Sequence, residues 1–218
     1  MSSFIKFANL AGKEGYSNIV DAAEAFQFNF SIGKGNEPPQ VKPVTRRIQT
    51  WNKEKTQLWQ ASPELFAANR RKPYQGWAKF RPHILKGFDL YSKTAQHKKA
   101  VTLGMHYVNR IEVDLSKNKP SDFIVFLPPE VAFADDIVNF GCQTEQEFKD
   151  AGRITIIAGN DISSEKGLAV VLNIIYTVKS PSLESNKLKE TIEKAHSRII
   201  GAFEKSITDL QRERMEAI

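Results

Sequence analysis

The sequence predicts an α+β fold, a curved and mostly antiparallel sheet of about eight strands with helices on one face. Segments in which apolar and polar residues alternate, as they do in half-buried strands, recur along most of the chain. The order of strand, linker, three strands and helix occurs twice along the sequence. These two observations predict two similar halves, 17–99 and 100–215, within a single domain 1–218.

The first half begins with a predicted strand over 25–32, "AFQFNFSI", in which every second residue is apolar. The glycines and prolines of "GKGNEPPQVKP" then interrupt regular structure. Three short strands follow in "VTRRIQTW", "TQLWQA" and "ELFAANRR". From Pro73 the apolar spacing becomes helical, with Trp77 and Phe88 on one face, and Pro82 predicts a kink or restart of that helix.

The second half begins with a long predicted strand, "AVTLGMHYVNRIEV", which has one apolar and one polar face. Three antiparallel strands are then expected in "IVNFGCQTEQEF", "RITIIAG" and "LAVVLNIIYTV", and the last should be central because both of its faces are apolar. An amphipathic helix is predicted over 183–214. At roughly 45 Å this helix exceeds what a domain of this size usually covers, so we expect part of it to meet a protein partner or a second copy of the chain.

Composition indicates an ordinary globular protein of 218 residues, with 41% hydrophobic and 26% charged residues. No apolar run approaches the roughly 20 residues needed to cross a bilayer. The N-terminal sequence lacks the basic segment followed by a long apolar segment that is typical of a secretory signal. A lone cysteine, Cys142, cannot form an internal disulfide. We therefore expect a cytoplasmic protein with no membrane association.

Positive charge is concentrated in the segment 42–99. This segment holds 14 Lys and Arg residues against three acidic residues, a balance of +11, whereas the whole chain carries only +6. The remainder of the chain is therefore negative, with a balance of −5. Such asymmetry predicts an electrostatic partner, and nucleic acid or another polyanion is the partner that we expect.

Four stretches resemble a family of uncharacterised bacterial proteins that is described as sporadically distributed. They are "IVDAAEAFQFNF", "SPELFAANRRKPYQGWAKF", "VTLGMHYVNRIEV" and the closing "ITDLQRERM", and the resemblance that rests on them covers most of the chain. The sequence departs from the family pattern after the first strand, where the "GKGNEPPQ" linker stands in place of a helix. The resemblance implies a shared fold, and it implies no catalytic residues.

The stretch "NRRKPYQGWAKFRPHILKGF", residues 69–88, combines basic and aromatic side chains and has no acidic residue. Lys and Arg can neutralise phosphates, and exposed aromatic rings can stack on unpaired bases. We therefore predict a nucleic-acid interface in which Tyr74 or Trp59 stacks where exposed. The cations predicted to contribute are Arg47, Arg70, Arg71, Lys72, Lys79 and Arg81. The alternative is that the aromatics belong to the core and the cations form a solvated rim.

Two further clusters suggest weaker chemistry. His106, Arg110 and Glu112 should share one strand face, either as an anion or proton-transfer site or, more simply, as an ion-pair cluster. Metal-dependent nucleases have an acidic residue followed, further along the chain, by an acidic residue and a lysine two positions apart. This pattern occurs here in Asp136, Glu147 and Lys149, but it is common by chance.

No phosphate-binding glycine loop, zinc-ligand spacing or nucleophile elbow occurs in the sequence. We therefore expect a non-catalytic module with no cofactor and no metal. It would bind a polyanion or, alternatively, serve as a protein-interaction subunit of a larger bacterial assembly. A small-molecule cavity between the sheet and the long helix is a third possibility.

Overall fold

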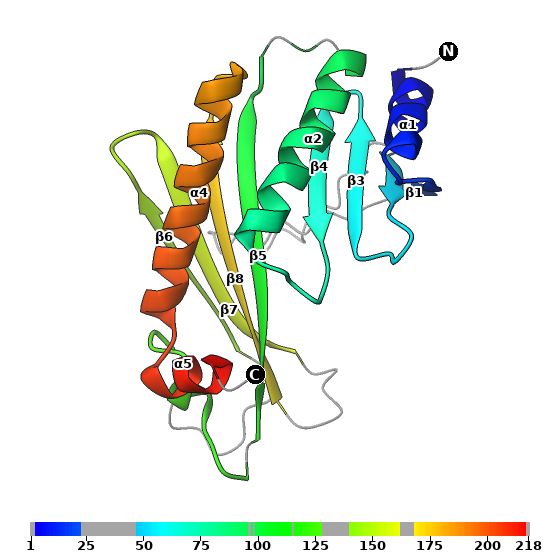
Figure 1. Cartoon of the computed structure of the whole chain (residues 1–218). Helices are drawn as coiled ribbons and strands as arrows, with labels where there is room; N and C mark the ends of the chain where they lie inside the picture. The colour runs from blue at the N-terminus through cyan, green and yellow to red at the C-terminus, as the bar shows by residue number, and fades with distance from the viewer. Residues whose placement is uncertain are drawn as a thin grey trace, which may run out of the picture. The chain divides into compact units, whose positions relative to one another are not determined.

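The computed structural model describes residues 3–22, 47–95, 97, 99–114, 116–127, 140–161 and 168–216. The chain divides into two compact units, Met1–His97 and Lys98–Ile218 (Figure 1). Each unit contains a four-stranded antiparallel sheet with helices. The α+β class and the antiparallel pairing are therefore confirmed, whereas one continuous curved sheet and a single domain stay predictions. The predicted strand 25–32 lies outside the described residues.

The first unit is an antiparallel meander of four strands in the order β1-β2-β3-β4, with two helices. Its elements are α1 (Ser3–Lys13), β1 (Asn18–Ala22), β2 (Arg47–Trp51), β3 (Gln57–Ser62), β4 (Leu65–Arg70) and α2 (Trp77–Ala95). The predicted strands of the meander correspond to β2, β3 and β4, and α2 continues through Pro82 as a single helix.

Helix α1 and strand β1 were not predicted from the sequence. The helix ends at Lys13 and is followed by Gly15, whose φ of 87° lies in the left-handed region that favours glycine. The amide of Tyr16 then donates to the carbonyl of Ala11 at 3.0 Å, and the amide of Gly15 donates to that of Gly12 at 3.1 Å. These bonds satisfy carbonyls at the helix end, so "AGKEGY" is a C-terminal helix signal that a search for strand alternation overlooks.

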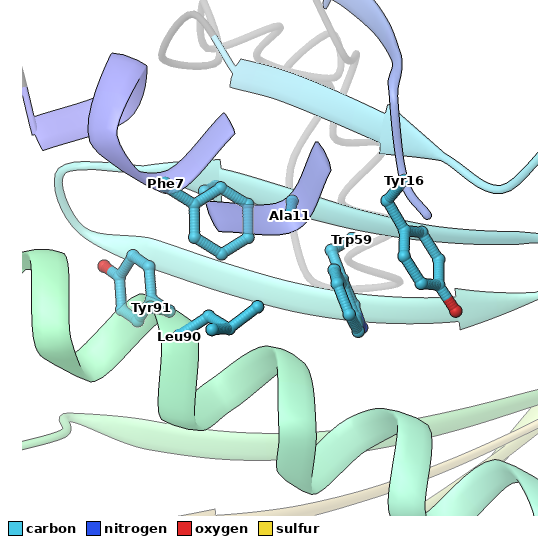
Figure 2. Packing of buried hydrophobic residues seen from close by; sticks show 7 residues of the cluster. Phe7, Ala11, Tyr16, Trp59, Leu90 and Tyr91 are labelled. Carbon is cyan, nitrogen blue, oxygen red and sulfur yellow. The ribbon is translucent and has the colours of Figure 1, made fainter. Parts of the chain in front are cut away.

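The core of the first unit lies between its helices and one face of its sheet. Figure 2 shows Phe7 of α1, Trp59 of β3, and Leu90 and Tyr91 of α2 pointing toward one another. The side chains of β2, β3 and β4 that share the Trp59 face, such as Phe66 of β4, pack against this cluster or lie beside it. Because strand residues alternate in direction, their neighbours face away from both helices.

The second unit consists of β5 (Thr102–Val113), the short 3-10 helix η1 (Pro120–Asp122), β6 (Gly141–Glu147), β7 (Gly152–Asp161), β8 (Leu168–Lys179), α4 (Ser185–Ser206) and α5 (Asp209–Glu216). Its strand order is β5-β8-β7-β6, so β8 is an inner strand, as its two apolar faces predict. Figure 1 shows α4 running along this sheet. The first strand of this unit pairs with the last, unlike in the first unit.

A C-terminal helix is confirmed, but its prediction as a single helix over 183–214 is wrong, because the chain breaks into α4 and α5. Ile207 is extended (φ −105°, ψ 153°) and forms a bridge with Ile124. The hydroxyl of Thr208 then accepts from the amide of Gln211 at 3.3 Å and so caps α5. The sequence "TDLQ" carries this capping pattern. The argument that the helix is too long for its own unit is therefore removed.

The apolar stripe of α4 is used within the second unit. Its residues Leu188, Ile192, Ala195, Ile199 and Phe203 are all buried, and α4 packs on β8, β5 and β7. Self-association through the C-terminal helices would have to use other residues, such as the exposed Ile200 of α4 or Leu210 of α5. A partner at the C-terminal helices stays a prediction.

Candidate nucleic-acid interface

The turn between β2 and β3 and the end of β4 lie side by side. Asn52 builds the turn, since its side-chain oxygen accepts from the amides of Thr56 and Gln57, each at 2.9 Å. The amide of Arg71 donates to the carbonyl of Thr56 at 2.8 Å. This bond extends the β3–β4 pairing beyond Arg70 and places the segment that follows β4 against the turn.

Four exposed cations gather at this end of the sheet: Lys53, Lys55, Arg71 and Lys72, here called the basic end. None of the four forms an ion pair with any residue that the structure describes. A single carboxylate, Glu54, lies in the same turn, where it accepts a hydrogen bond from Asn52 at 2.9 Å. The basic end therefore carries a local excess of positive charge.

Many cations elsewhere have carboxylate partners. The pairs in the described ranges include Lys86–Glu14, Lys93–Asp89, Arg110–Glu112, Lys117–Asp114, Arg153–Glu147, Lys187–Glu184, Arg198–Asp150 and Arg212–Glu204. Unpaired positive charge attracts anions more strongly than paired charge, because a neighbouring carboxylate cancels most of the field. Exposed lysines without an ion pair in the described ranges also occur in the second unit, at Lys119, Lys149, Lys179, Lys189 and Lys205. The basic end is therefore distinguished by the gathering of four such cations at one end of a sheet.

Aromatic side chains border the basic end. The guanidinium of Arg71 lies 4.5 Å from the ring centre of Trp51, a cation–π contact on the sheet face opposite the helices. Tyr74, in the connection between β4 and α2, is 49% exposed and makes an edge contact with Phe80 at 6.3 Å. Trp51 and Tyr74 are therefore the aromatic residues near the basic end with surface available.

Trp59 cannot serve as the exposed stacking residue that the sequence allowed. It is 0% exposed and lies between Tyr16 and His83, with ring centres at 3.9 and 5.1 Å. Its indole nitrogen donates to the carbonyl of His83 at 3.1 Å, which fixes the ring in the core. The alternation that marks a strand does not reveal that α1 and α2 both cover this face.

The predicted cations divide between the two sides of the sheet. Arg71 and Arg47 belong to the face opposite the helices, but they lie near opposite ends of it, since the length of β2, about 13 Å, separates Arg47 from Trp51. Arg70 is half-buried and by alternation faces the helices. Lys79 and Arg81 belong to α2, exposed and half-buried respectively. The structure therefore keeps Arg71, Lys72 and Tyr74 together and separates Arg47 from them.

Beneath this region Tyr16, Gln57 and His83 form a buried polar cluster. The Tyr16 hydroxyl lies 2.5 Å from Gln57 Oε1 and 2.9 Å from His83 Nδ1, so it donates to the amide oxygen and accepts from the imidazole. His83 Nε2 is buried without a hydrogen bond of good geometry. Burial lowers the pKa of His83 to about 4, with the Arg70 charge acting in the same direction. Burial likewise raises the pKa of Tyr16 to about 12.

Arg70 faces this cluster as a half-buried cation. Its Nε is buried without a hydrogen-bond partner, and within the described ranges no carboxylate pairs with it. Its charge lowers the pKa values of both Tyr16 and His83, which places it near them. An uncompensated cation of this kind adds positive potential behind the basic end.

The other clusters that the sequence indicated are mostly paired within the second unit. Arg110 pairs with Glu112 and also with Asp161, the latter at 3.2 Å, as expected of an ion-pair cluster. His106 instead bonds the uncharged amide of Asn173, at 3.0 Å. Glu147 pairs with Arg153 at 2.5 Å. The sequence prediction of a nuclease site included Asp136, which lies outside the described residues, and Lys149, which is exposed.

Several residues of the interface were missed from the sequence. Lys53 and Lys55 lie in the turn, and their proximity to Arg71 becomes visible only once β3 and β4 are paired. On the face opposite the helices, Gln49, Gln60 and Asn69 form a row. The alternation in "RIQTW", "QLWQAS" and "LFAANRR" could have placed these amides on one face together with Arg47, Trp51 and Arg71.

Comparisons with protein-family models, with curated proteins and with solved structures each gave no significant match. The resemblance to the sporadically distributed bacterial family therefore stays a prediction. In the part of the chain that the structure describes, no helix is long and apolar enough to cross a membrane. The same residues contain no group of three potential metal ligands.

Proposed function

We propose that the protein is a non-catalytic module that binds nucleic acid or another polyanion through the basic end of its first unit. The observation that carries the proposal is the gathering of Lys53, Lys55, Arg71 and Lys72, none of which has an ion-pair partner among the described residues. Phosphate contacts by such side chains release counterions, so the affinity should fall as the salt concentration rises. Lys79 and Arg81 on α2 add positive charge that follows the basic end in the sequence, and Arg47 stands apart from it.

The experiment compares two triple variants that remove the same charge. One carries Lys53→Gln, Lys55→Gln and Lys72→Gln in the basic end. The control carries Lys93→Gln, Lys117→Gln and Lys187→Gln, three exposed lysines that pair with carboxylates. Fluorescence anisotropy of labelled DNA and RNA, single- and double-stranded, is measured for each protein from low to physiological salt. Thermal unfolding checks that each variant is folded.

The basic-end variant should bind more weakly, with a slope of log K against log salt reduced by up to about 3, since each lysine that no longer neutralises a phosphate lowers the slope by about one. The control should keep the wild-type slope, because its lysines are neutralised by their partners. Equal losses of affinity in the two variants would mean that net charge alone governs binding, and unchanged binding in the basic-end variant would reject the proposed surface.

A protein partner is the second candidate, and the same charge excess is compatible with an acidic protein surface. Co-purification of a partner that survives nuclease treatment, together with no binding of any nucleic acid at low salt, would favour it. In this second candidate function the protein is a subunit of a bacterial assembly. We also propose that it is cytoplasmic and that its strands form a single curved sheet.

A further inference from the structure

One face of the first sheet carries neither of the unit's helices. Both α1 and α2 pack on the Trp59 face. On the opposite face β2, β3 and β4, with the residue after β4, present Arg47, Gln49, Trp51, Gln60, Asn69 and Arg71. Asn69 and Arg71 are exposed, the other four are half-buried, and Leu58 and Ser62 on the same face are buried. This open face has arginines near both ends, and the strand residues that β2, β3 and β4 place on it include no carboxylate.

Amide side chains form a row across the open face. Gln49 Nε2 lies 3.5 Å from Gln60 Oε1, and Gln60 Nε2 donates to Asn69 Oδ1 at 2.9 Å. The row spans β2, β3 and β4 and uses one donor and one acceptor of Gln60. Among the residues that the structure describes, no side-chain partner is found for the oxygen of Gln49 or for the amide hydrogens of Asn69, so these atoms keep hydrogen-bonding capacity toward a ligand. An acceptor at one end and donors at the other match the mixed donor and acceptor edges of nucleobases.

A flat cation borders the amide row next to the basic end. Arg71 lies over Trp51, and Trp51 is paired with Leu58, whose other neighbour is Asn69. A guanidinium that lies over an aromatic ring can stack a second ring on its outer side, and nucleobases stack on guanidinium planes as well as on aromatic rings. Phosphate-binding cations, a stacking surface and base-edge amides therefore adjoin one another.

We propose that the open face binds a single-stranded nucleic acid, with phosphates at the basic end and bases against the row of Gln49, Gln60 and Asn69. This inference rests on the proposed function and specifies its ligand. A duplex keeps its bases paired and stacked, whereas a single strand presents base edges and faces to a protein surface. Base-free polyanions can satisfy the cations and leave the amides and the Arg71 surface unused.

The test uses three labelled probes of equal length, with one phosphate charge per nucleotide. They are a mixed-sequence single strand, an abasic strand with the same sugar–phosphate backbone, and a duplex of the mixed sequence. The single strand is made both as DNA and as RNA, so that the experiment shows which of the two nucleic acids the protein prefers. The proteins are the wild type, Gln60→Ala/Asn69→Ala, and the control Gln146→Ala, an exposed amide of β6. The basic-end triple variant completes the set.

The wild type should prefer the base-containing strand over the abasic strand by at least about tenfold. Gln60→Ala/Asn69→Ala should reduce that preference several-fold while abasic binding stays unchanged, and Gln146→Ala should change neither. A variant that merely loosened the sheet would weaken both probes together. The basic-end variant should weaken both probes by a similar factor.

Each alternative result has a definite meaning. Equal wild-type affinity for base-containing and abasic strands would overturn the inference and leave the proposed polyanion function standing. Preference for the duplex, or a preference that the double amide variant retains, would also overturn it. No binding of any probe at low salt would remove the proposed function and this inference together.

Discussion

His83 is a buried titratable residue in the core of the first unit. It is 7% exposed, stacks on Trp59 and Tyr16, and shares a hydrogen bond with the Tyr16 hydroxyl. Protonation would place a second charge beside Arg70 in a buried cluster with no described carboxylate partner. The neutral imidazole therefore belongs to the folded state, and Tyr16 and Gln57 fix which of its nitrogens carries the hydrogen.

The first unit should lose stability as pH falls from about 6.5 to about 4. The pKa of His83 is about 4 in the folded chain and 6.5 when unfolded, so the unfolded state takes up the proton first. The stability is complete above 6.5 and decreases by about 3 kcal/mol by pH 4. Denaturant unfolding followed by tryptophan fluorescence reports this unit, because Trp51, Trp59 and Trp77 all lie in it.

His83→Phe should flatten this dependence between about pH 6.5 and 5, above the range in which ordinary carboxylates titrate. His106→Gln, at an exposed position of β5, is the control and should retain the wild-type profile. If His83→Phe instead keeps the wild-type pH dependence, the pKa assigned to His83 is wrong.

Helix α2 approaches strand β3 closely at Gly87. A Cβ atom on Gly87 would lie 2.3 Å from the indole nitrogen of Trp59, and that ring is held between Tyr16 and His83. The backbone of α2 can therefore approach the Trp59 ring only where the helix has no side chain. The same contact brings the carbonyl of His83 within hydrogen-bond distance of the indole.

Gly87→Ala should destabilise the first unit by about 2 kcal/mol or more, because the buried ring must shift or α2 must move away. Gly201→Ala in α4 is the matched control, since a Cβ atom at that position would have no neighbouring atom within 4 Å. Alanine there should raise stability by up to about 1 kcal/mol through helix propensity. Thermal and denaturant unfolding measure both, and a neutral Gly87→Ala would contradict the close packing of α2 on Trp59.

Elements with strict alternation were the most predictable from sequence. The strands around Trp51, Trp59 and Phe66 and the inner position of β8 follow from side-chain periodicity, which is a local property. Helix α1 and the break at Ile207 depend on end signals, "KEGY" and "TDLQ", that a search for apolar stripes overlooks. The tightly packed contact at Gly87 depends on tertiary structure, so no local sequence pattern predicts it.

The candidate site was predictable in part for the same reason. Charge counting located the segment that holds Arg71, Lys72 and Tyr74, and these residues do lie together. It could not assign faces, so Trp59 was retained as a stacking residue and Lys53 was overlooked. Strand register and turn geometry determine which cations have a carboxylate partner. Neither can be read from the sequence.

On the scale of the whole molecule, the two units differ in their electrostatics. Four exposed cations without described partners gather at the basic end of the first unit. In the second unit Arg153, Arg198 and Arg212 are each paired with carboxylates, and exposed lysines without described partners, such as Lys149 and Lys189, are far apart in the sequence. In the second unit Asp150 locks the β6–β7 turn to α4, through Arg198 at 2.9 Å and Lys194 at 3.1 Å. We therefore expect nucleic acid to contact the first unit, and the second to contribute little to affinity.

Ultraviolet cross-linking of the wild-type protein to a single-stranded oligonucleotide, followed by mass spectrometry of the peptides, tests this account most directly. The expected adducts lie on peptides of the first unit that contain Trp51, Lys53 or Tyr74, and the basic-end variant should give fewer of them. Efficient adducts confined to the second unit, or adducts that the basic-end variant leaves unchanged, would contradict the claim that the basic end is the nucleic-acid interface.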